Sequence, residues 1–253
     1  VINYSVEEHA PASIENLNLD YDFNFLTLSQ WSPRKNFENS IKWWVEEFFD
    51  QEVGLVIKTN MIANCIMDRE ITKKNIASLL REYPDRKCKV YLLHGDLSEG
   101  QMHGLYQNPK IKALINIAHG EGFGLPMFEA ASHGLPVVTI GWSGQLDYLH
   151  HDGKNYFQEV NFSMQPVQQA AVWPGVIEQN TMWAFAEQGS YKMTLRKVHK
   201  NYSKVKEVAD ELKTIIHEKF SEGDIYKQFV DSVLGFDSAT IQPPDVDSLM
   251  EFE

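Results

Sequence analysis

The stretch from His119 to Glu129, His-Gly-Glu-Gly-Phe-Gly-Leu-Pro-Met-Phe-Glu, limits the folds open to this chain more than any other segment. An apolar run, residues 112–118, comes directly before it and is typical of a buried parallel strand. Pro126 has the fixed φ angle that suits the first position of a helix. The sequence therefore predicts a strand that passes through a glycine-rich turn into a helix.

The glycines of this turn favour an anion site. Backbone amides at the start of a helix point outward without an acceptor, and their partial positive charge attracts anions. Residues without a Cβ let a ligand approach those amides closely. We call residues 120–125 the cradle and predict that they hold a phosphate. Its expected donor-binding members are Gly122, Phe123, Gly124 and Leu125.

Two glutamates, Glu121 and Glu129, flank the predicted phosphate. A pair that hydrolyses a glycosidic bond has its carboxyl groups about 5 to 9.5 Å apart. A rise of about 1.5 Å per residue places these two backbones up to roughly 12 Å apart. Separate roles fit better, because one carboxylate can accept hydrogen bonds from a ribose and the other from a second sugar. In the plain alternative, Glu129 only favours a helix N-terminus and Glu121 is a solvated loop acid.

Glu121-x7-Glu129 lies within His-Gly-Glu-Gly-Phe-Gly-Leu-Pro-x-x-Glu-Ala, and His-Gly-Leu-Pro-Val-Val follows at residues 133–138. This combination resembles the signature of the donor-binding half of GT-B glycosyltransferases, in particular the large retaining family 4 (glycosyl transferases group 1). The resemblance extends from about Phe23 to Phe236. In that family the first glutamate faces the transferred sugar and the second binds the nucleotide ribose. The resemblance thus implies a catalytic Glu121 and a ribose-binding Glu129.

The resemblance also implies a reaction. A nucleoside-diphosphate sugar is the expected donor, and its glycosyl group passes to an acceptor with retention of configuration. The base, the sugar and the acceptor stay open. No cofactor or metal is expected, because GT-B enzymes generally manage without a bound metal. Asp20-x-Asp22 and Asp245-x-Asp247 resemble the metal pair of another glycosyltransferase fold, but they lie in polar flanks and receive no metal role.

A chain of 253 residues fits one large domain or one and a half, whereas a complete GT-B enzyme needs two such domains. Residues 1–6 resemble the segment that leaves the first domain in these enzymes. We therefore expect the acceptor-binding N-terminal half to be missing and activity to depend on it. The alternative is a non-catalytic module for sugar-nucleotide binding or assembly. An epimerase or phosphorylase on the same architecture would need other motifs, which we do not find.

Composition excludes several other classes. A formal charge of −12 and a pI near 5.2 argue against a nucleic-acid surface, which needs clustered Lys and Arg. Cys65 and Cys88 lack metal-ligand spacing and form no disulfide framework, so a reducing, cytoplasmic setting is favoured. No apolar run approaches the ~18 residues that span a bilayer. Peripheral membrane contact is expected only through the missing half.

Strand and helix patterns alternate along the first part of the chain. This alternation predicts right-handed crossovers and an α/β fold, a Rossmann-like open parallel sheet with helices on both faces. The expected strands are 23–29, 53–58, 89–94, 112–118 and 136–140, and the expected helices between them are 37–49, 71–81, 98–106 and 126–133.

Four segments are expected. A lead segment, 1–22, precedes the nucleotide-sugar-binding domain, 23–180, and C-terminal helices follow at 181–236, roughly Tyr191 to Phe220 and Asp224 to Leu234, with no further strand from about Met182 onward. In the family the last helix braces the other domain. Without that domain its apolar face is expected to be exposed or paired with another molecule, such as a second copy of this chain. The acidic stretch 237–253 is expected to be a mobile tail.

In open parallel sheets a ligand binds beyond the carboxyl ends of the strands. That rule selects five loops that should line one crevice. They are residues 29–35, 58–59, 94–97, 119–124 and 141–145.

The first of these loops contains Arg34 and Lys35. The family keeps a basic residue here on the donor diphosphate, and Lys35 fits that position best. A cation there would stabilise the charge that builds on the leaving group, which makes Lys35 the second expected catalytic residue. The family usually has a further Arg near the end of the first strand, where this chain has Ser-Gln-Trp at residues 29–31. Diphosphate binding must then depend on Lys35, with Arg34 or Lys58 as substitutes.

Five more residues complete the predicted site. Asp96 and Leu97 match the loop that faces the nucleotide base, and Asp96 can accept from a donor edge such as that of guanine, or simply cap the following helix. His119 shares a turn with the cradle and is expected either to bond a phosphate or sugar hydroxyl or to be structural. Ser143 and Gly144 match a turn close to the donor and can donate to its sugar or phosphate.

Overall fold

The structure of this chain is a computed structural model, and it describes residues 2–15 and 17–235. The predicted acidic tail, residues 237–253, and the Asp245-x-Asp247 pair lie outside the described residues.

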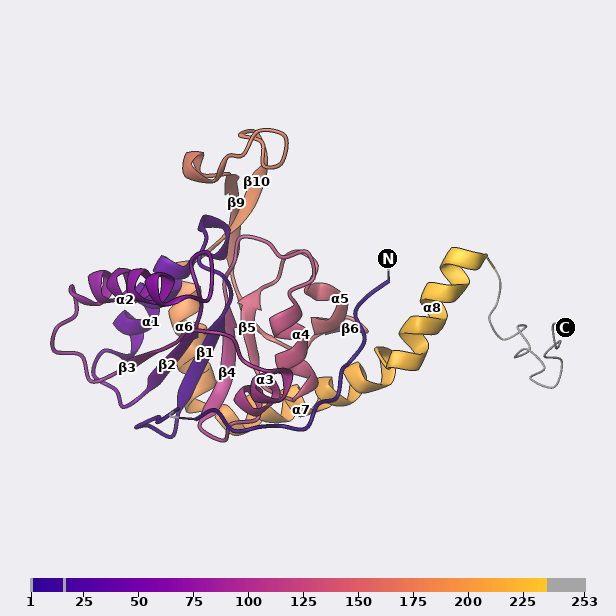
Figure 1. Cartoon of the computed structure of the whole chain (residues 1–253), viewed down its shortest axis with the longest axis horizontal. Coiled ribbons are helices and arrows are strands. Elements are labelled where there is room, and N and C mark those ends of the chain that lie inside the picture. The colour runs from indigo at the N-terminus through magenta and orange to yellow at the C-terminus, as the bar shows by residue number, and fades with distance from the viewer. Residues whose placement is uncertain (1, 16, 236–253) are drawn as a thin grey trace, which may run out of the picture.

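The centre of the fold is a six-stranded, wholly parallel sheet (Figure 1). Its strand order is β3-β2-β1-β4-β5-β8, so the chain first builds outward on one side of β1 and then crosses to the other. The strands are β1 (Asn24–Leu28), β2 (Gly54–Lys58), β3 (Lys89–Leu93), β4 (Ile111–Asn116), β5 (Val137–Ile140) and β8 (Gln158–Val160).

Helices cover both faces of the sheet, so successive side chains of each strand are shielded from water and most are apolar. Neighbouring side chains of one strand point to opposite faces, so Phe25 packs in one core and Leu26 in the other. The first core is closed by α1 (Phe37–Phe48), α2 (Ile66–Leu80) and α6 (Gln188–Lys200). The second is closed by α3 (Glu99–Tyr106), α4 (Leu125–Ser132) and α7 (Tyr202–Lys219). The predicted α/β fold class is confirmed.

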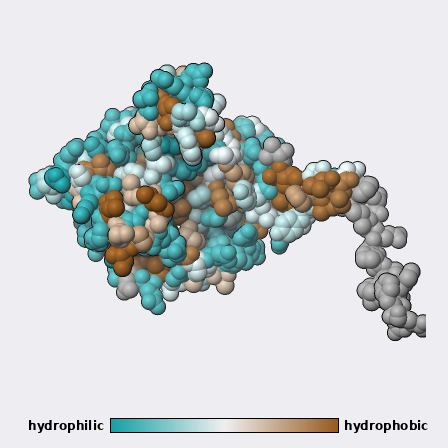
Figure 2. Space-filling model, turned by 45° about the horizontal axis from the view of Figure 1, so that its top comes forward, coloured by the Kyte–Doolittle hydropathy of each residue, from teal (hydrophilic) through white to brown (hydrophobic). Residues whose placement is uncertain are grey.

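The predicted helix from Tyr191 to Phe220 is two helices. Asn201 separates α6 from α7 with φ −118° and ψ 34°, outside helical values, and lets α7 turn onto the opposite face of the sheet. The last described helix, α8 (Glu222–Leu234), projects away from the body (Figure 1). Ile225 is buried at its start, but the apolar side chains Phe229, Val233 and Leu234 are exposed, and Figure 2 shows apolar surface on this projecting helix.

The prediction that no strand follows about Met182 is wrong. An antiparallel pair, β9 (Phe162–Pro166) and β10 (Met182–Ala186), rises from the body beyond the carboxyl ends of the parallel strands (Figure 1). We call residues 162–186 the arm. Its two strands are separated by a long connection that contains the short helix η2 (Gln169–Ala171). Such distant pairing leaves no local turn signal in the sequence.

The lead segment has no helix or strand in residues 2–15 and 17–22 and runs across α3. It lies close enough that a Cβ at Gly104 would come 2.0 Å from the carbonyl oxygen of Ala12. Further along, Val6 donates its amide to the carbonyl of Phe220 at 2.8 Å. The lead segment therefore packs on the same face as α3, α4 and the end of α7.

The remaining short elements lie between the main strands and helices. They are η1 (Pro33–Lys35), α5 (Leu146–Leu149), β6 (His150–His151) and β7 (Lys154–Asn155).

No helix in the described parts of the chain is both long enough and apolar enough to cross a bilayer.

Candidate functional site

Hydrogen bonds join the five loops at the carboxyl edge of the sheet into one continuous rim. Each loop is bonded to the next one along the edge, so the predicted neighbourhood is present. The links are Lys58 Nζ to Gly95 O at 2.7 Å, Thr59 Oγ1 to Ser29 O at 2.7 Å, His119 N to Arg34 O at 2.8 Å and Gly144 N to Glu121 O at 3.1 Å.

Glu121 is a buried side chain of this rim that accepts four hydrogen bonds. It is 8% exposed, although it follows β4 in a loop. Lys35 Nζ donates to its two carboxylate oxygens at 2.6 and 2.8 Å. Arg34 Nη1 donates to Oε2 at 3.1 Å, and Asn116 Nδ2 donates to Oε1 at 3.0 Å. Two predicted site cations and one predicted catalytic acid thus meet at one point.

Burial and charge oppose each other at this point. Burial raises the pKa of the Glu121 carboxyl, but attraction to Lys35 and the hydrogen bonds from Lys35 and Asn116 outweigh it, so the pKa lies below its usual value. Burial lowers the pKa of the Lys35 ammonium against the pull of Glu121. The carboxylate is therefore held in its charged form by the groups around it.

A tight loop places the two cations. Pro33 begins η1, and Asn36 ends it in the left-handed region with φ 53°. Asn36 then donates its side-chain amide to the carbonyl of Ile117 at 3.3 Å. Since Asn tolerates this conformation better than most residues, the loop can turn back onto the end of β4. Arg34 and Lys35 consequently face Glu121.

The cradle has the geometry of an anion site. Gly124 is the N-cap of α4 with φ 81°, a conformation that a residue with a side chain rarely adopts. A Cβ at Gly122 would meet no atom within 4 Å, so the space above it is open. Within the described chain, the amides of residues 122–125 donate to no acceptor. These unsatisfied donors at a helix start favour an anion.

Ser143 and Gly144 support the cradle from behind. Ser143 has φ 82°, and its hydroxyl donates to the carbonyl of Glu121 at 2.6 Å while accepting from the Glu121 amide at 3.2 Å. A Cβ at Gly144 would lie 1.8 Å from the carbonyl oxygen of Gly122. The turn that contains both residues is therefore in contact with the backbone of the cradle.

Glu129 lies one turn into α4, and its hydrogen-bond partner differs from those of Glu121. Tyr106 donates its hydroxyl to Oε2 of Glu129 at 2.7 Å. Burial raises the pKa of Glu129, and the Tyr106 bond only partly offsets this. A cavity of about 130 Å³ lies beside it, walled by α4, by His103 of α3 and by residues 4–7 of the lead segment.

The base-facing loop follows β3. Asp96 is exposed, and its carboxylate accepts a hydrogen bond from Asn64. Leu97 is half-buried and packs against the core. Lys58, predicted as a substitute on the diphosphate, instead donates to the Gly95 carbonyl at 2.7 Å, and burial lowers its pKa. Its position steadies this loop.

The structure places the ring of His119 beneath the arm. The ring is 1% exposed, bonds the carbonyl of Ala184 through Nδ1 at 2.8 Å and lies against Trp183 and Phe185. Its Nε2 is buried and has no partner among the described residues. In this conformation the ring joins the cradle turn to the arm and offers no surface to a ligand.

Comparison with known proteins supplies the fold family. No family model matches the chain, and no curated protein matches it. Among solved structures it is similar to sucrose-phosphate synthase from Thermosynechococcus elongatus (TM-score 0.62, 15% identity, 89% of this chain and 48% of that one). It is also similar to HepE from Anabaena, solved with UDP and glucose (TM-score 0.58, 15% identity, 85% and 48%). A third is an E. coli trehalose-6-phosphate protein bound with UDP-2-fluoro glucose (TM-score 0.57, 9% identity, 85% and 44%).

These structures are GT-B glycosyltransferases. This chain has a GT-B domain fold. It spans about half the length of the solved structures that it matches, 48% of the first and 44% of the third. At these identities the likeness establishes the fold and leaves the activity to be argued from the site.

Within the GT-B domain, three polar residues that contact Glu121, Glu129 or His94 were not selected from the sequence. Asn116 ends an otherwise apolar strand, and an amide there is a signal that could have been used. Tyr106 is hidden at the end of α3 and meets Glu129 only in three dimensions. Asp68, in the first turn of α2, resembles an ordinary capping residue, yet it also contacts the loop after β3.

The GT-B domain has one group of side chains that could hold a metal ion among the residues the structure describes. It consists of Glu7, His9 and Glu99, whose ligand atoms lie within 4.8 Å of one another. Glu7 and Glu99 are exposed, and the group lies between the lead segment and the start of α3, with Glu7 also lining the cavity beside Glu129. The expectation that the predicted site itself needs no metal stays a prediction.

Proposed function

We propose that this chain is the donor-binding half of a retaining glycosyltransferase, which binds a nucleoside-diphosphate sugar and transfers its glycosyl group when joined to an N-terminal half. The observation that carries the proposal is the buried Glu121 carboxylate, held by Lys35 and Arg34 beside a helix start whose amides lack acceptors. Two neighbours in fold were solved with UDP and glucose or with UDP-2-fluoro glucose, which agrees with a sugar-nucleotide donor.

The proposed donor follows the rim. Its diphosphate accepts hydrogen bonds from the amides of residues 122–125, and the α4 dipole adds to that attraction. Lys35 and Arg34 are close enough to Glu121 to be shared between its carboxylate and the diphosphate. Glu129 accepts from the ribose hydroxyls in place of the Tyr106 hydroxyl. The base lies over the loop that contains Asp96.

Local charge makes such a site workable on an acidic protein. The chain has a formal charge of −12, yet Lys35, Arg34 and Lys58 all lie at one edge of the sheet. Both lysines are partly shielded from water, so their attraction for an anion is stronger than on an open surface. A diphosphate binds where Lys35, Arg34 and the cradle amides converge, and Lys58 adds to the positive charge along the same edge.

The same groups suit the transfer step. When the bond between the anomeric carbon and the donor phosphate oxygen breaks, its electron pair stays on the nucleoside diphosphate. Lys35 and the cradle amides stabilise that growing charge. Glu121 holds the sugar hydroxyls in the reactive pose, and an acceptor hydroxyl forms the new bond on the same face of the sugar. The acceptor proton passes to the leaving phosphate.

Catalysis requires a second side to the cleft in which donor and acceptor meet, and we assign that side to the N-terminal half. The alternative, a sugar-nucleotide-binding module without catalysis, is favoured by the fact that this chain spans only about half of its matched structures, 48% in two of them. Turnover measured for this chain with and without a GT-B N-terminal half separates the two functions. The transferase proposal expects turnover only with both halves.

Calorimetric titration with GDP, UDP and ADP tests donor binding. We expect at least one of them to bind wild-type chain, and Glu129→Ala to weaken that binding about tenfold or more, since it removes charged acceptors of ribose hydroxyls. Glu211→Ala, which removes an exposed acid from α7, is the control and should bind like wild type. No binding of any of the three at millimolar concentration, or unchanged binding by Glu129→Ala, would refute the proposal.

A further inference from the structure

Asp68 is a buried carboxylate that the proposed function does not use. It lies in the first turn of α2 and is 5% exposed. Its two oxygens accept from the backbone amides of Met61, Ile62 and Ala63 at 3.0, 2.7 and 3.0 Å, and from the Thr72 hydroxyl at 3.2 Å. These bonds fix the loop between β2 and α2, residues 59–65.

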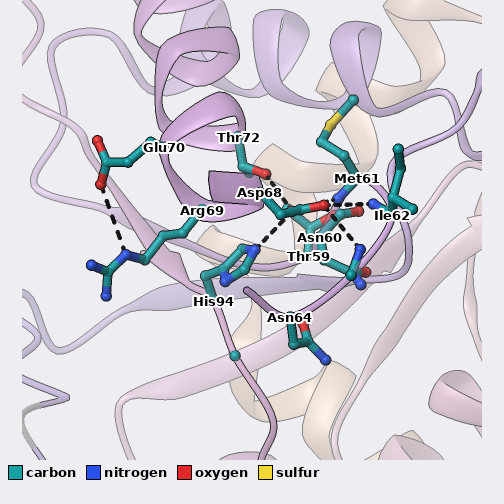
Figure 3. A network of polar contacts seen from close by, with 12 residues as sticks. Thr59, Asn60, Met61, Ile62, Asn64, Asp68, Arg69, Glu70, Thr72 and His94 are labelled. Carbon is teal, nitrogen blue, oxygen red and sulfur yellow. Dashed lines mark hydrogen bonds and ion pairs between the residues drawn. The ribbon is translucent and has the colours of Figure 1, made fainter. Parts of the chain in front are cut away.

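A fifth donor comes from a different loop. His94, at the end of β3, has its Nε2 2.8 Å from Oδ1 of Asp68, and the two side chains are 3% and 6% exposed (Figure 3). The His94 ring and the amides of residues 61–63 converge on one carboxylate. A single buried group thereby ties the loop after β2 to the loop after β3.

Two outer links act between the same two loops. Asn64 donates its side-chain amide to Asp96, and Lys58 donates to the carbonyl of Gly95. Gly95 has φ 109°, and a Cβ at this residue would meet no atom within 4 Å, so no neighbouring group packs on that side of its backbone. The shape of residues 95–96 therefore depends on Asp68, Asn64 and Lys58. We call Asp68, His94 and Asn64 the strut.

The position of the strut suits a nucleotide whose phosphates lie on the cradle. In the sheet order, β3 is separated from β4 by β2 and β1. Three strand spacings of about 4.8 Å place the loop after β3 roughly 14 Å from the cradle, a length that an extended nucleoside diphosphate can cover. The base then reaches Asp96, whose carboxylate only accepts hydrogen bonds.

We propose that Asp68 is a positioning residue for base recognition: through His94 and Asn64 it fixes the Asp96 carboxylate that reads the donor edge of the nucleobase. The inference rests on the proposed function. Asp68 acts through its neighbours and does not touch the ligand. Its five hydrogen bonds hold the loop that contains Asp96 in place before the ligand binds. Fewer groups then lose conformational freedom on binding, which lowers the entropy cost.

The test compares dissociation constants for GDP, UDP and ADP between wild type and variants of the strut. His94→Leu removes the link between the loops but leaves the amide bonds to Asp68 in place. His94→Gln keeps a donor that can reach Asp68 and should restore the wild-type pattern in part. His150→Leu, an exposed histidine on β6, is the matched control. Circular dichroism and thermal unfolding establish that each variant is folded.

We expect the wild-type protein to bind the three nucleotides with different dissociation constants. His94→Leu should reduce the ratio between the largest and the smallest of these constants by about tenfold. The weakest nucleotide should bind as before, because its phosphates still meet an intact cradle. A uniform loss for all three, no loss for any, or a wild type that does not discriminate would each overturn the inference. A wild type that binds none of them would count against the proposed function instead.

Discussion

Lys35 Nζ lies 2.6 Å from Oε1 and 2.8 Å from Oε2 of Glu121, although 86 positions separate the two residues in the chain. The contact exists because β1 and β4 are neighbours in the sheet and the loops after them meet at one edge. Lys35, which we propose to stabilise the leaving diphosphate, is thus held in place by Glu121, which we propose to bind the sugar. The donor diphosphate would have to share it.

Replacing Lys35 with Met should destabilise the fold as well as weaken binding. The change leaves the buried Glu121 carboxylate with only Arg34 and Asn116, so we expect the free energy of unfolding to fall by about 1–3 kcal/mol. Urea denaturation measures it. Lys154→Met, which breaks the exposed pair with Glu211, should cost clearly less. Equal losses in the two variants would show that the Lys35–Glu121 contact is no stronger than a surface pair.

The pH dependence of stability should contain a contribution from Glu121. Its folded-state pKa lies below the usual 4.5, so ionised Glu121 stabilises the fold above that pH and the contribution is lost as pH falls through the lower, folded value. The difference in unfolding free energy between wild type and Glu121→Gln should therefore be largest near neutral pH and shrink below pH 4.5. A difference that grows on acidification would contradict the charge arrangement.

Two glycines of the rim should respond differently to alanine. Gly122→Ala places a methyl group in open space, so stability should change by less than about 1 kcal/mol while nucleotide binding weakens about tenfold or more. Gly144→Ala places a Cβ 1.8 Å from the Gly122 carbonyl and should lower both stability and binding. Gly189→Ala, in α6 with no nearby atoms, is the control. Unchanged binding by Gly122→Ala would remove the cradle from the proposed site.

Asp96 should favour guanine. A carboxylate can accept from the two adjacent N–H groups on the guanine edge. Uracil offers one N–H between two carbonyl oxygens, and these oxygens repel the oxygens of a carboxylate. GDP should therefore bind more tightly than UDP, and Asp96→Asn should reduce that preference about tenfold. Tighter binding of UDP than of GDP by the wild type would contradict this role for Asp96. Competition against a fluorescent nucleotide measures both constants together.

Much of the fold could be predicted because its signals are local. Each apolar run such as residues 112–118 forms a strand covered on both faces, and Pro126 starts α4 close to the predicted position. The arm could not be predicted in this way. Its strands pair across a long connection, and β9 is largely exposed and ends in a proline. The break at Asn201 was missed because both flanking segments favour helix.

The residues of the site also fall into those that the sequence could predict and those that it could not. The glycine turn, its two glutamates and Lys35 stand out by residue type and by their place after a strand, and the structure brings Lys35, Arg34 and Glu121 together. The burial of His119 was not visible, because the arm that covers it follows 65 positions later in the chain. Tyr106 likewise meets Glu129 only when α3 packs near α4, and Asp68 meets His94 only when the loop after β3 lies beside α2. Sequence spacing carries no information about such contacts.

A crystal structure of this chain with bound GDP tests the central claim most directly, since that claim concerns where a nucleoside diphosphate lies. We predict phosphate oxygens within hydrogen-bonding distance of the amides of residues 122–125 and of Lys35 Nζ, and ribose hydroxyls on the Glu129 carboxylate. A nucleotide bound elsewhere, with the cradle amides still unoccupied, would contradict the account.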